Sequence, residues 1–147
     1  EIFNKKLPSE KPNKTSALSS HTGEPSDAGS TVQENLAKPR VLMNCYSGSA
    51  ELARQYVKLG AKISLAGPIT YKNARRNIEV AEAVDLKDLL IETDSPYLAP
   101  VPMRGRRNIP PYVEFVARKI AEVKGITFKE VAEQTFKNAC EFYGIRP

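Results

Sequence analysis

One stretch, Leu89 to Arg107, limits more than any other what this chain can fold into. It reads LLIETDSPYLAPVPMRGRR, in which a short apolar run is followed at once by the acidic residues Glu92 and Asp94 and then by a Ser-Pro turn. A continuous apolar run is typical of a parallel strand that is buried on both faces. In α/β sheets and barrels, ligand-binding groups lie at the carboxyl ends of such strands. The sequence therefore predicts a buried strand that delivers two carboxylates to a site.

Glu92 and Asp94 are the first candidates for chemistry. They are two residues apart, so on a strand their side chains point to the same face, while Thr93 points to the other. Two like charges on one face repel each other unless a cation or a donor lies between them, and a divalent metal ion fits that position. The alternative interpretation is that these acidic residues cap a following helix or lie in a solvated turn.

The loop that follows, from Tyr97 to Asn108, favours the metal interpretation. Two prolines and Gly105 make it rigid and allow close backbone approach, and it carries three arginines, Arg104, Arg106 and Arg107. Guanidinium groups bind phosphate, and carboxylates bind the metal ions that activate water. Together they predict a phosphoester site, although arginines on a loop are also commonly solvated or paired with a carboxylate of the same protein.

Strand and helix patterns alternate along the rest of the chain, which predicts an α/β fold with a parallel sheet. Strands are expected over 40–46, 62–65 and 89–91, and helices over 50–59, 73–84 and 112–124. A last helix runs from a Thr127–Glu130 capping box to Gly144. The residues expected to face the core recur at helical spacing. They are Leu52, Tyr56 and Leu59, then Ala74, Ile78 and Ala81, then Val113, Val116, Ala117 and Ile120, and finally Phe128, Val131, Ala132, Thr135, Phe136 and Ala139.

Two segments resemble the TatD family of metal-dependent deoxyribonucleases, within the amidohydrolase-like TIM barrel superfamily. IETDSPYLAPVPMRGRRNIPPYV is similar to the family's final strand and loop, and NCYSGSAELARQYVKLGAKISLAGPITYKNA is similar to the preceding HCFSG or HCYSG segment. With the terminal helices, the resemblance covers roughly Val41 to Tyr143. It implies the C-terminal part of a (β/α)8 barrel, with about three βα units plus terminal helices.

The resemblance also implies roles for individual residues. Asp94 corresponds to the last metal ligand, which also holds the attacking water, so it is the predicted catalytic residue. Asn44 stands where the family has a metal-binding histidine, and its amide oxygen suits Mg²⁺ or Ca²⁺ better than Zn²⁺. Glu92 is expected to orient a metal ligand or a neighbouring loop. Arg104, Arg107 and Asn108 follow the family pattern and are predicted to bind phosphate or the substrate backbone.

Size limits how much of that barrel this chain can form. A complete barrel needs about 250 residues, and this chain has 147 and begins at Glu1 without a methionine. The family's HxH pair, its middle-strand glutamate and its strand-five histidine have no counterpart, so whether the chain is itself an enzyme is left open. Residues 1–39, rich in Ser, Lys and Pro, predict a disordered insertion or linker, and residues 40–147 the barrel part. The only histidine, His21, lies in the polar segment and is expected to be solvated.

Composition adds limited information. The net charge of +5 agrees with a polyanionic partner. No apolar run reaches the roughly 18 residues that a membrane helix needs, so no membrane association is expected. Cys45 and Cys140 lack the spacing of a metal knuckle and are expected to be buried, reduced thiols of a cytoplasmic protein, with a disulfide between them as the alternative.

The predicted function is therefore a metal-dependent hydrolase that cleaves DNA phosphodiester bonds as part of a complete barrel, using a divalent cation (Mg, Mn or Zn). Its expected partners are single-stranded DNA or duplex ends, and either the missing N-terminal barrel half or a second copy of the chain. Two alternatives remain. One is a catalytically impaired remnant that binds nucleic acid or has a structural role, and the other is a barrel hydrolase acting on a small amide or ester, which would have little use for the arginine loop.

Overall fold

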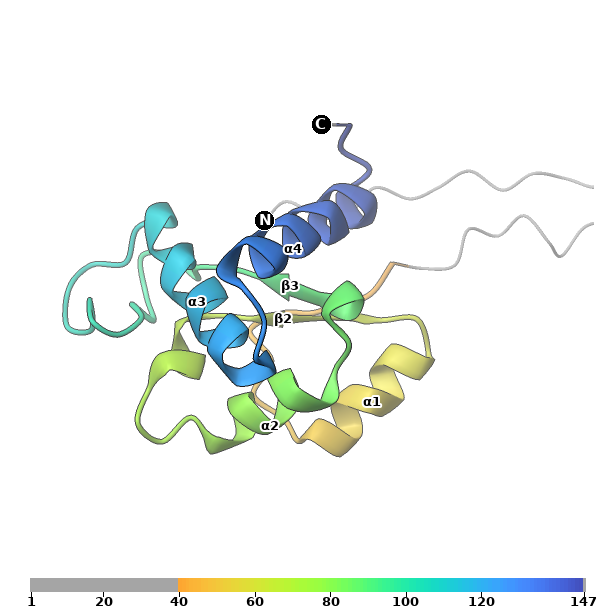
Figure 1. Cartoon of the computed structure of the whole chain (residues 1–147), viewed down its shortest axis with the longest axis horizontal. Helices are drawn as coiled ribbons and strands as arrows, with labels where there is room; N and C mark the ends of the chain where they lie inside the picture. Colours follow the sequence, from red (N-terminus) through yellow and green to blue (C-terminus); the bar gives the residue numbers. More distant parts are fainter. Residues whose placement is uncertain (1–39, 147) are drawn as a thin grey trace, which may run out of the picture. The chain divides into compact units, whose positions relative to one another are not determined.

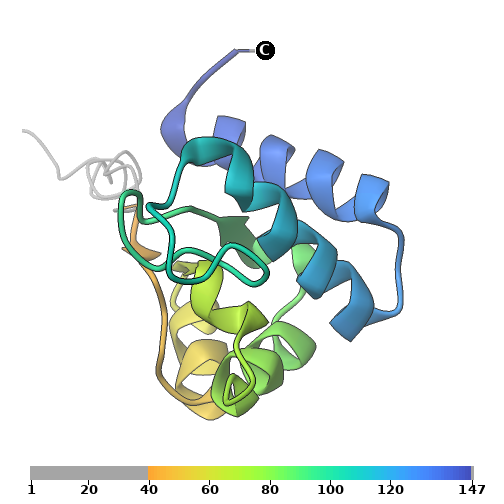
Figure 2. The same cartoon turned by 90° about the vertical axis from the view of Figure 1, so that its left-hand side faces the viewer.

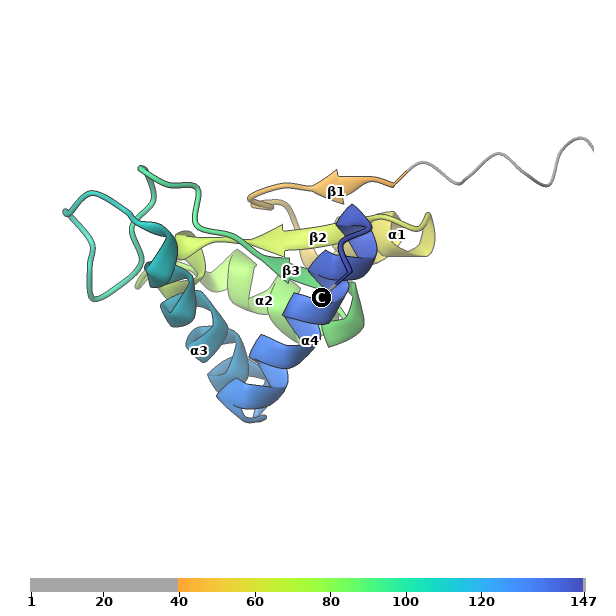
Figure 3. The ribbon, with the colours of Figure 1, turned by 90° about the horizontal axis from the view of Figure 1, so that it is seen from above.

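Three short parallel strands organise the part of the chain that the structure describes. The structure is a computed structural model, and it describes residues 40–146. The strands are β1 (Leu42–Met43), β2 (Lys62–Leu65) and β3 (Leu89–Ile91), in the order β1-β2-β3. Leu42 pairs with Lys62, and Ile63 pairs with Leu89. Figure 3 shows the strands side by side. The predicted α/β fold with a parallel sheet is therefore confirmed.

Four α-helices connect and follow the strands (Figure 1). They are α1 (Ala50–Lys58), α2 (Arg75–Ala83), α3 (Val113–Lys124) and α4 (Phe128–Tyr143), with the 3-10 helices η1 (Gly67–Thr70), η2 (Leu86–Asp88) and η3 (Pro110–Tyr112) between them. Each α-helix packs against the next in chain order, while α1 contacts β2, and α3 and α4 contact β3. The helices thus cover β2 and β3, while the two residues of β1 are only half-buried.

The predicted helix ends are confirmed by their capping contacts. The Ser49 side chain accepts a hydrogen bond from the Leu52 amide at the start of α1. Thr127 and Glu130 form the reciprocal capping box that opens α4. Gly125 ends α3 and Gly144 ends α4, both in the left-handed conformation that glycine adopts without steric cost.

The core lies between the sheet and the helices, and its largest fully buried apolar side chains are Ile63, Leu65, Ile69, Leu89 and Ile120. The predicted inward face of α1 was partly wrong, because Leu52 and Leu59 are exposed at 45% and 84%. The small Ala53, fully buried, brings the helix close to the sheet instead, with Tyr56 and Val57 packed beside it. Phe136 of α4 is likewise exposed, at 62%.

Both cysteines are free thiols, as predicted, but only Cys140 is buried, while Cys45 is half-buried. Within residues 40–146, no helix is long and apolar enough to cross a membrane. The predictions for residues 1–39, including the linker and a solvated His21, lie outside the described residues.

Candidate functional site

The candidate site is built from the segments that leave the carboxyl ends of the three strands. Because the strands are parallel, these segments emerge at the same edge of the sheet. Backbone bonds continue the pairing past the strand ends: Tyr46 N donates to Ser64 O at 2.9 Å, and Glu92 N donates to Leu65 O at 3.0 Å. Asn44 and Glu92, which follow the two outer strands, are thereby placed on either side of β2.

Glu92 bridges the two outer segments. Its carboxylate accepts a hydrogen bond from the backbone N–H of Cys45 and, with the amide oriented so that its nitrogen faces Glu92, a second from Asn44 Nδ2. Burial raises the pKa of Glu92, and the hydrogen bonds from Cys45 and Ser64 oppose that rise. Glu92 therefore ties the loop after β1 to the end of β3.

Asp94 occupies a different setting from Glu92. Strand β3 ends at Ile91, and Asp94 has φ +57, in the left-handed region, with an exposed side chain. The prediction that both carboxylates share one face of a strand was wrong, because neither lies in the strand. Burial is the main cause that raises the pKa of both Glu92 and Cys45, and the negative charge of Asp94 adds to the rise.

The arginine loop is the long connection between β3 and α3 (Figure 2). The Arg104 guanidinium stacks on the Tyr71 ring, with its central carbon 4.1 Å from the ring centroid, and the Tyr71 hydroxyl donates to Ala99 O at 3.1 Å. Burial raises the pKa of Tyr71, against the lowering effect of Arg104. Arg106 and Arg107 are exposed. Sequence reasoning missed Tyr71, because an aromatic residue on a connecting segment gives no signal of what it stacks on.

Asn108 differs from the expectation that it binds phosphate. Its side chain is buried, and Nδ2 donates to the backbone oxygens of Thr93 and Tyr97, each at 2.6 Å. Both donors of the amide are therefore used within the loop. Direct contact of Asn108 with a phosphate has no support in this geometry.

Gly67 allows the loop to close against the end of β2. A Cβ built on Gly67 would collide with the backbone oxygen of Leu98 and would lie 3.2 Å from the nitrogen of Pro100. Thr70 adds a further attachment, because its hydroxyl oxygen accepts from Val101 N at 2.8 Å. Only a residue without a side chain fits at position 67 with the loop in this place.

The donors at this edge do not complete a metal site by themselves. Within residues 40–146, no group of three or more His, Cys, Asp and Glu side chains could hold a metal ion. Asp94 and Asn44, which the resemblance predicts to be metal ligands, are both exposed at this edge. Further ligands would have to come from another part of the protein or from another chain.

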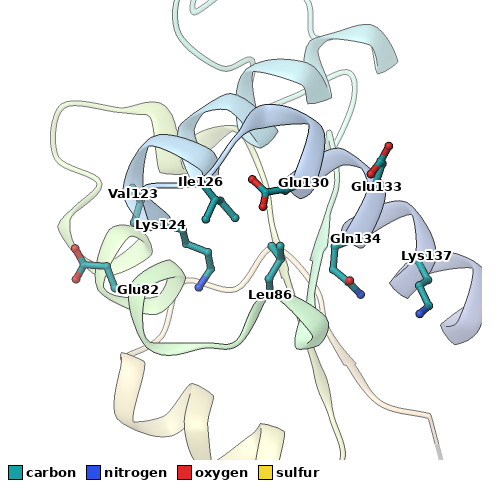
Figure 4. A pocket seen from close by; sticks show the side chains of 9 residues that line it. All are labelled: Glu82, Leu86, Val123, Lys124, Ile126, Glu130, Glu133, Gln134 and Lys137. Atoms are coloured by element: carbon teal, nitrogen blue, oxygen red, sulfur yellow. The ribbon is translucent and has the colours of Figure 1, made fainter.

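A cavity of about 750 Å³ lies elsewhere, between α2, η2 and the start of α4 (Figure 4). Glu82 and Leu86 line it from one side and Glu130 from the other, and Lys124 donates from its ammonium group to Val84 O at 2.7 Å. No residue of the carboxyl-edge site lines it. It therefore has no direct part in the chemistry considered for Asp94.

Comparison with known proteins decides the family. The sequence matches the family model described as TatD related DNase over residues 17–144. The chain belongs to this family. The match begins before Val41, where the resemblance seen in the sequence starts, and so includes part of the segment predicted to be a linker.

Relatives of the TatD family support the assignment. The chain is 47% identical over 104 residues to the uncharacterized metal-dependent hydrolase YabD of Bacillus subtilis, and 40% identical over 104 residues to YcfH of Escherichia coli K12, which has the same description. The alignments cover 71% of this chain but 41% and 39% of those proteins. The chain therefore spans about two fifths of the length of these relatives.

Solved structures agree with this placement. A TatD homologue, YjjV of Escherichia coli K12, superposes with a TM-score of 0.66 at 28% identity, covering 71% of this chain and 40% of that one. A TatD family hydrolase of Entamoeba histolytica superposes with a TM-score of 0.62 at 18% identity, covering 71% and 42%, and this likeness concerns the fold alone. The fold of the described part is thus that of TatD family structures.

Proposed function

We propose that this chain contributes the C-terminal part of a metal-dependent hydrolase that cleaves phosphodiester bonds of DNA within a complete barrel. The observation that carries the proposal is the exposed Asp94 carboxylate at the carboxyl edge of the sheet, on the same loop as three exposed arginines. Relatives named as metal-dependent hydrolases support the metal requirement. The arginines favour an anionic substrate, which a small neutral amide or ester would not need.

The ligand chemistry of this edge favours an oxygen-preferring cation. A carboxylate and an amide oxygen suit Mg²⁺ or Mn²⁺, whereas Zn²⁺ is held better by imidazole and thiolate. When bound, such a cation lowers the pKa of a coordinated water and polarises the phosphoryl oxygen. In this chain Asp94 would hold the cation, Glu92 would keep Asn44 in place, and Arg104 would bind the substrate phosphate.

Substitution of Asp94 tests the proposal in the complete protein. Asp94→Asn keeps the size of the side chain but removes its charge, and we expect loss of single-stranded DNA cleavage in Mg²⁺, Mn²⁺ or Zn²⁺. Asp85→Asn is the matched control, because Asp85 is an exposed carboxylate before η2, away from the site. Unchanged cleavage by the Asp94 variant would remove this residue from the mechanism.

Asn44→His distinguishes an active site from a remnant. Histidine at position 44 supplies the imidazole that the family carries there, so a large gain in metal-dependent cleavage means that the remaining ligands are in place. A complete protein that is inactive both before and after the substitution favours a role in nucleic-acid binding or structure. Substrate binding with little salt dependence would instead favour a small uncharged substrate.

A further inference from the structure

The backbone around Asp94 is held by one side chain from the far end of the arginine loop. Asn108 Nδ2 donates to Thr93 O, just before Asp94, and to Tyr97 O, just after the turn, each at 2.6 Å. The Asn108 backbone N–H donates to Pro96 O at 3.0 Å. Three hydrogen bonds from one residue therefore bracket Asp94 on both sides.

The turn at Asp94 is held by several contacts. Asp94 lies at φ +57, in the left-handed region, which costs about 1–2 kcal/mol for most residues with a side chain and less for aspartate. Local bonds also support it: Tyr97 N donates to Asp94 O at 2.9 Å, and Ser95 N to Thr93 Oγ1 at 3.3 Å. Backbone conformations of this kind persist where surrounding contacts over-determine them.

Asn108 uses the nitrogen of its side-chain amide, and not the oxygen, to hold the loop. The residue is 2% exposed, and among the described residues its Oδ1 has no hydrogen-bond partner. A buried acceptor without a partner costs roughly 1–3 kcal/mol. The structure keeps Asn108 despite that cost because its two N–H donors satisfy two backbone oxygens at once.

We propose that Asn108 is a positioning residue that sets the direction of the Asp94 carboxylate by holding the backbone of Thr93 and Tyr97. The same contacts tie the arginine loop to Asp94, so that the groups proposed to bind metal and phosphate move as one unit. The consequence for catalysis rests on the proposed function, whereas the restraint on the backbone does not.

Two substitutions in the complete protein test the restraint. Asn108→Asp keeps the shape of the side chain but replaces its donors with acceptors, and Asn108→Leu removes both donors and the unpartnered oxygen. We expect amide exchange in residues 93–97 to accelerate by about tenfold or more in both variants, with β2 and α3 unchanged. Asn73→Asp is the control, because Asn73 is exposed on the segment before α2.

Kinetics test the catalytic consequence. Misplacement of a reacting group by about 1 Å can cost about 100-fold in rate, so kcat should fall by about that factor while KM for DNA, carried by the arginines, changes less than about twofold. Unchanged exchange in residues 93–97, or faster exchange throughout β2 and α3, would overturn the restraint. Faster amide exchange in residues 93–97 with an unchanged kcat would overturn the role of Asn108 in catalysis. A wild-type protein without nuclease activity would count against the proposed function, and the exchange data would still decide the restraint.

Discussion

At the scale of single residues, two carboxylates two positions apart have different environments and so different uses. Glu92 is half-buried and accepts hydrogen bonds from the segment after β1, whereas Asp94 is exposed in a left-handed turn. Because Glu92 is half-buried and hydrogen-bonded, it connects the segment after β1 to the end of β3, whereas the exposed Asp94 can reach a ligand. The environment of each carboxylate, more than its identity, separates the two roles.

Gly67→Ala tests how closely the arginine loop packs against the end of β2. The added methyl group would meet the backbone oxygen of Leu98, which cannot rotate away as a side chain can. We expect the variant to lose about 1–3 kcal/mol of unfolding free energy, measured by urea denaturation, and residues 93–108 to exchange faster.

Gly60→Ala provides the comparison. Gly60 has φ +91 with open space around its Cα, so alanine there strains the backbone without touching the loop. This variant should lose stability while residues 93–108 keep their protection. Equal loosening of the loop in both variants would contradict the steric explanation for Gly67.

Arg104 tests whether stacking or charge matters at the loop. Its guanidinium lies over the Tyr71 ring, and the ammonium group of lysine lacks the planar, delocalised charge that stacks on an aromatic ring. In the complete protein, Arg104→Ala should weaken single-stranded DNA binding and reduce by about 0.7 the slope of the logarithm of the binding constant against the logarithm of the salt concentration. Arg104→Lys should weaken binding but keep this slope. Fluorescence anisotropy at several salt concentrations measures both. Identical slopes for wild type and Arg104→Ala would exclude a phosphate contact.

At the scale of secondary-structure elements, the capping box of α4 is the contact most directly open to measurement. Thr127 Oγ1 accepts from the Glu130 amide, and the Glu130 carboxylate accepts from the Thr127 amide and hydroxyl. Thr127→Ala should therefore cost about 1 kcal/mol of unfolding free energy at neutral pH. Lys129→Ala, at an exposed position of the same helix, is the control.

The pH dependence of the capping box follows from Glu130. The hydrogen bonds from Thr127 hold the pKa of Glu130 below its ordinary value of 4.5. A lowered pKa in the folded state means that Glu130 stabilises the fold above pH 4.5 and loses this effect as the pH falls through its folded pKa. Glu130→Gln should therefore be less stable than wild type at pH 7, and the difference should shrink below pH 4.5. A difference that stays constant across this range would contradict the assignment.

The elements show what the sequence could and could not predict. Capping residues such as Ser49 and Gly125 act on their immediate neighbours, so their effect is visible locally in the sequence. The face of α1 was misjudged at Leu59 because large apolar residues were weighted above the small Ala53 that permits close packing. Asn138, buried in α4, donates from Nδ2 to Leu86 O and Leu89 O, each at 2.7 Å. It and Asn108 were missed as buried connectors, since their partners lie 11 to 52 residues away. Such long-range hydrogen bonds leave no periodic pattern.

At the scale of the whole molecule, the described part has a sheet with two outer strands that each pair on one side only. Within residues 40–146, β1 and β3 both pair with β2 alone. Unpaired edges and exposed apolar residues beside them promote association. Leu59, 84% exposed, lines a cavity with Val41 just before β1. This surface would be covered by the rest of a barrel or by another copy.

Leu59→Glu tests that expectation on the chain by itself. We expect the 147-residue chain to associate as its concentration rises, and the charge at position 59 to weaken association by about tenfold, because a buried leucine side chain contributes about 1.5–3 kcal/mol. Sedimentation equilibrium measures the effect. Lys58→Gln, at an exposed neighbouring position, controls for the change in charge, because it also lowers the net charge by one. A chain that stays monomeric at every concentration would contradict the prediction.

The contacts that hold the Asp94 turn have a consequence for chimeric proteins. The contacts that hold it come from Gly67, Thr70 and Asn108, all inside this stretch of sequence. A chimera that joins residues 40–146 to the front half of another TatD family barrel would therefore receive its carboxylate already oriented. Exchanging barrel halves between relatives should preserve the conformation of the Asp94 turn. Poor packing should arise mainly where residues 40–146 meet the other half of the barrel.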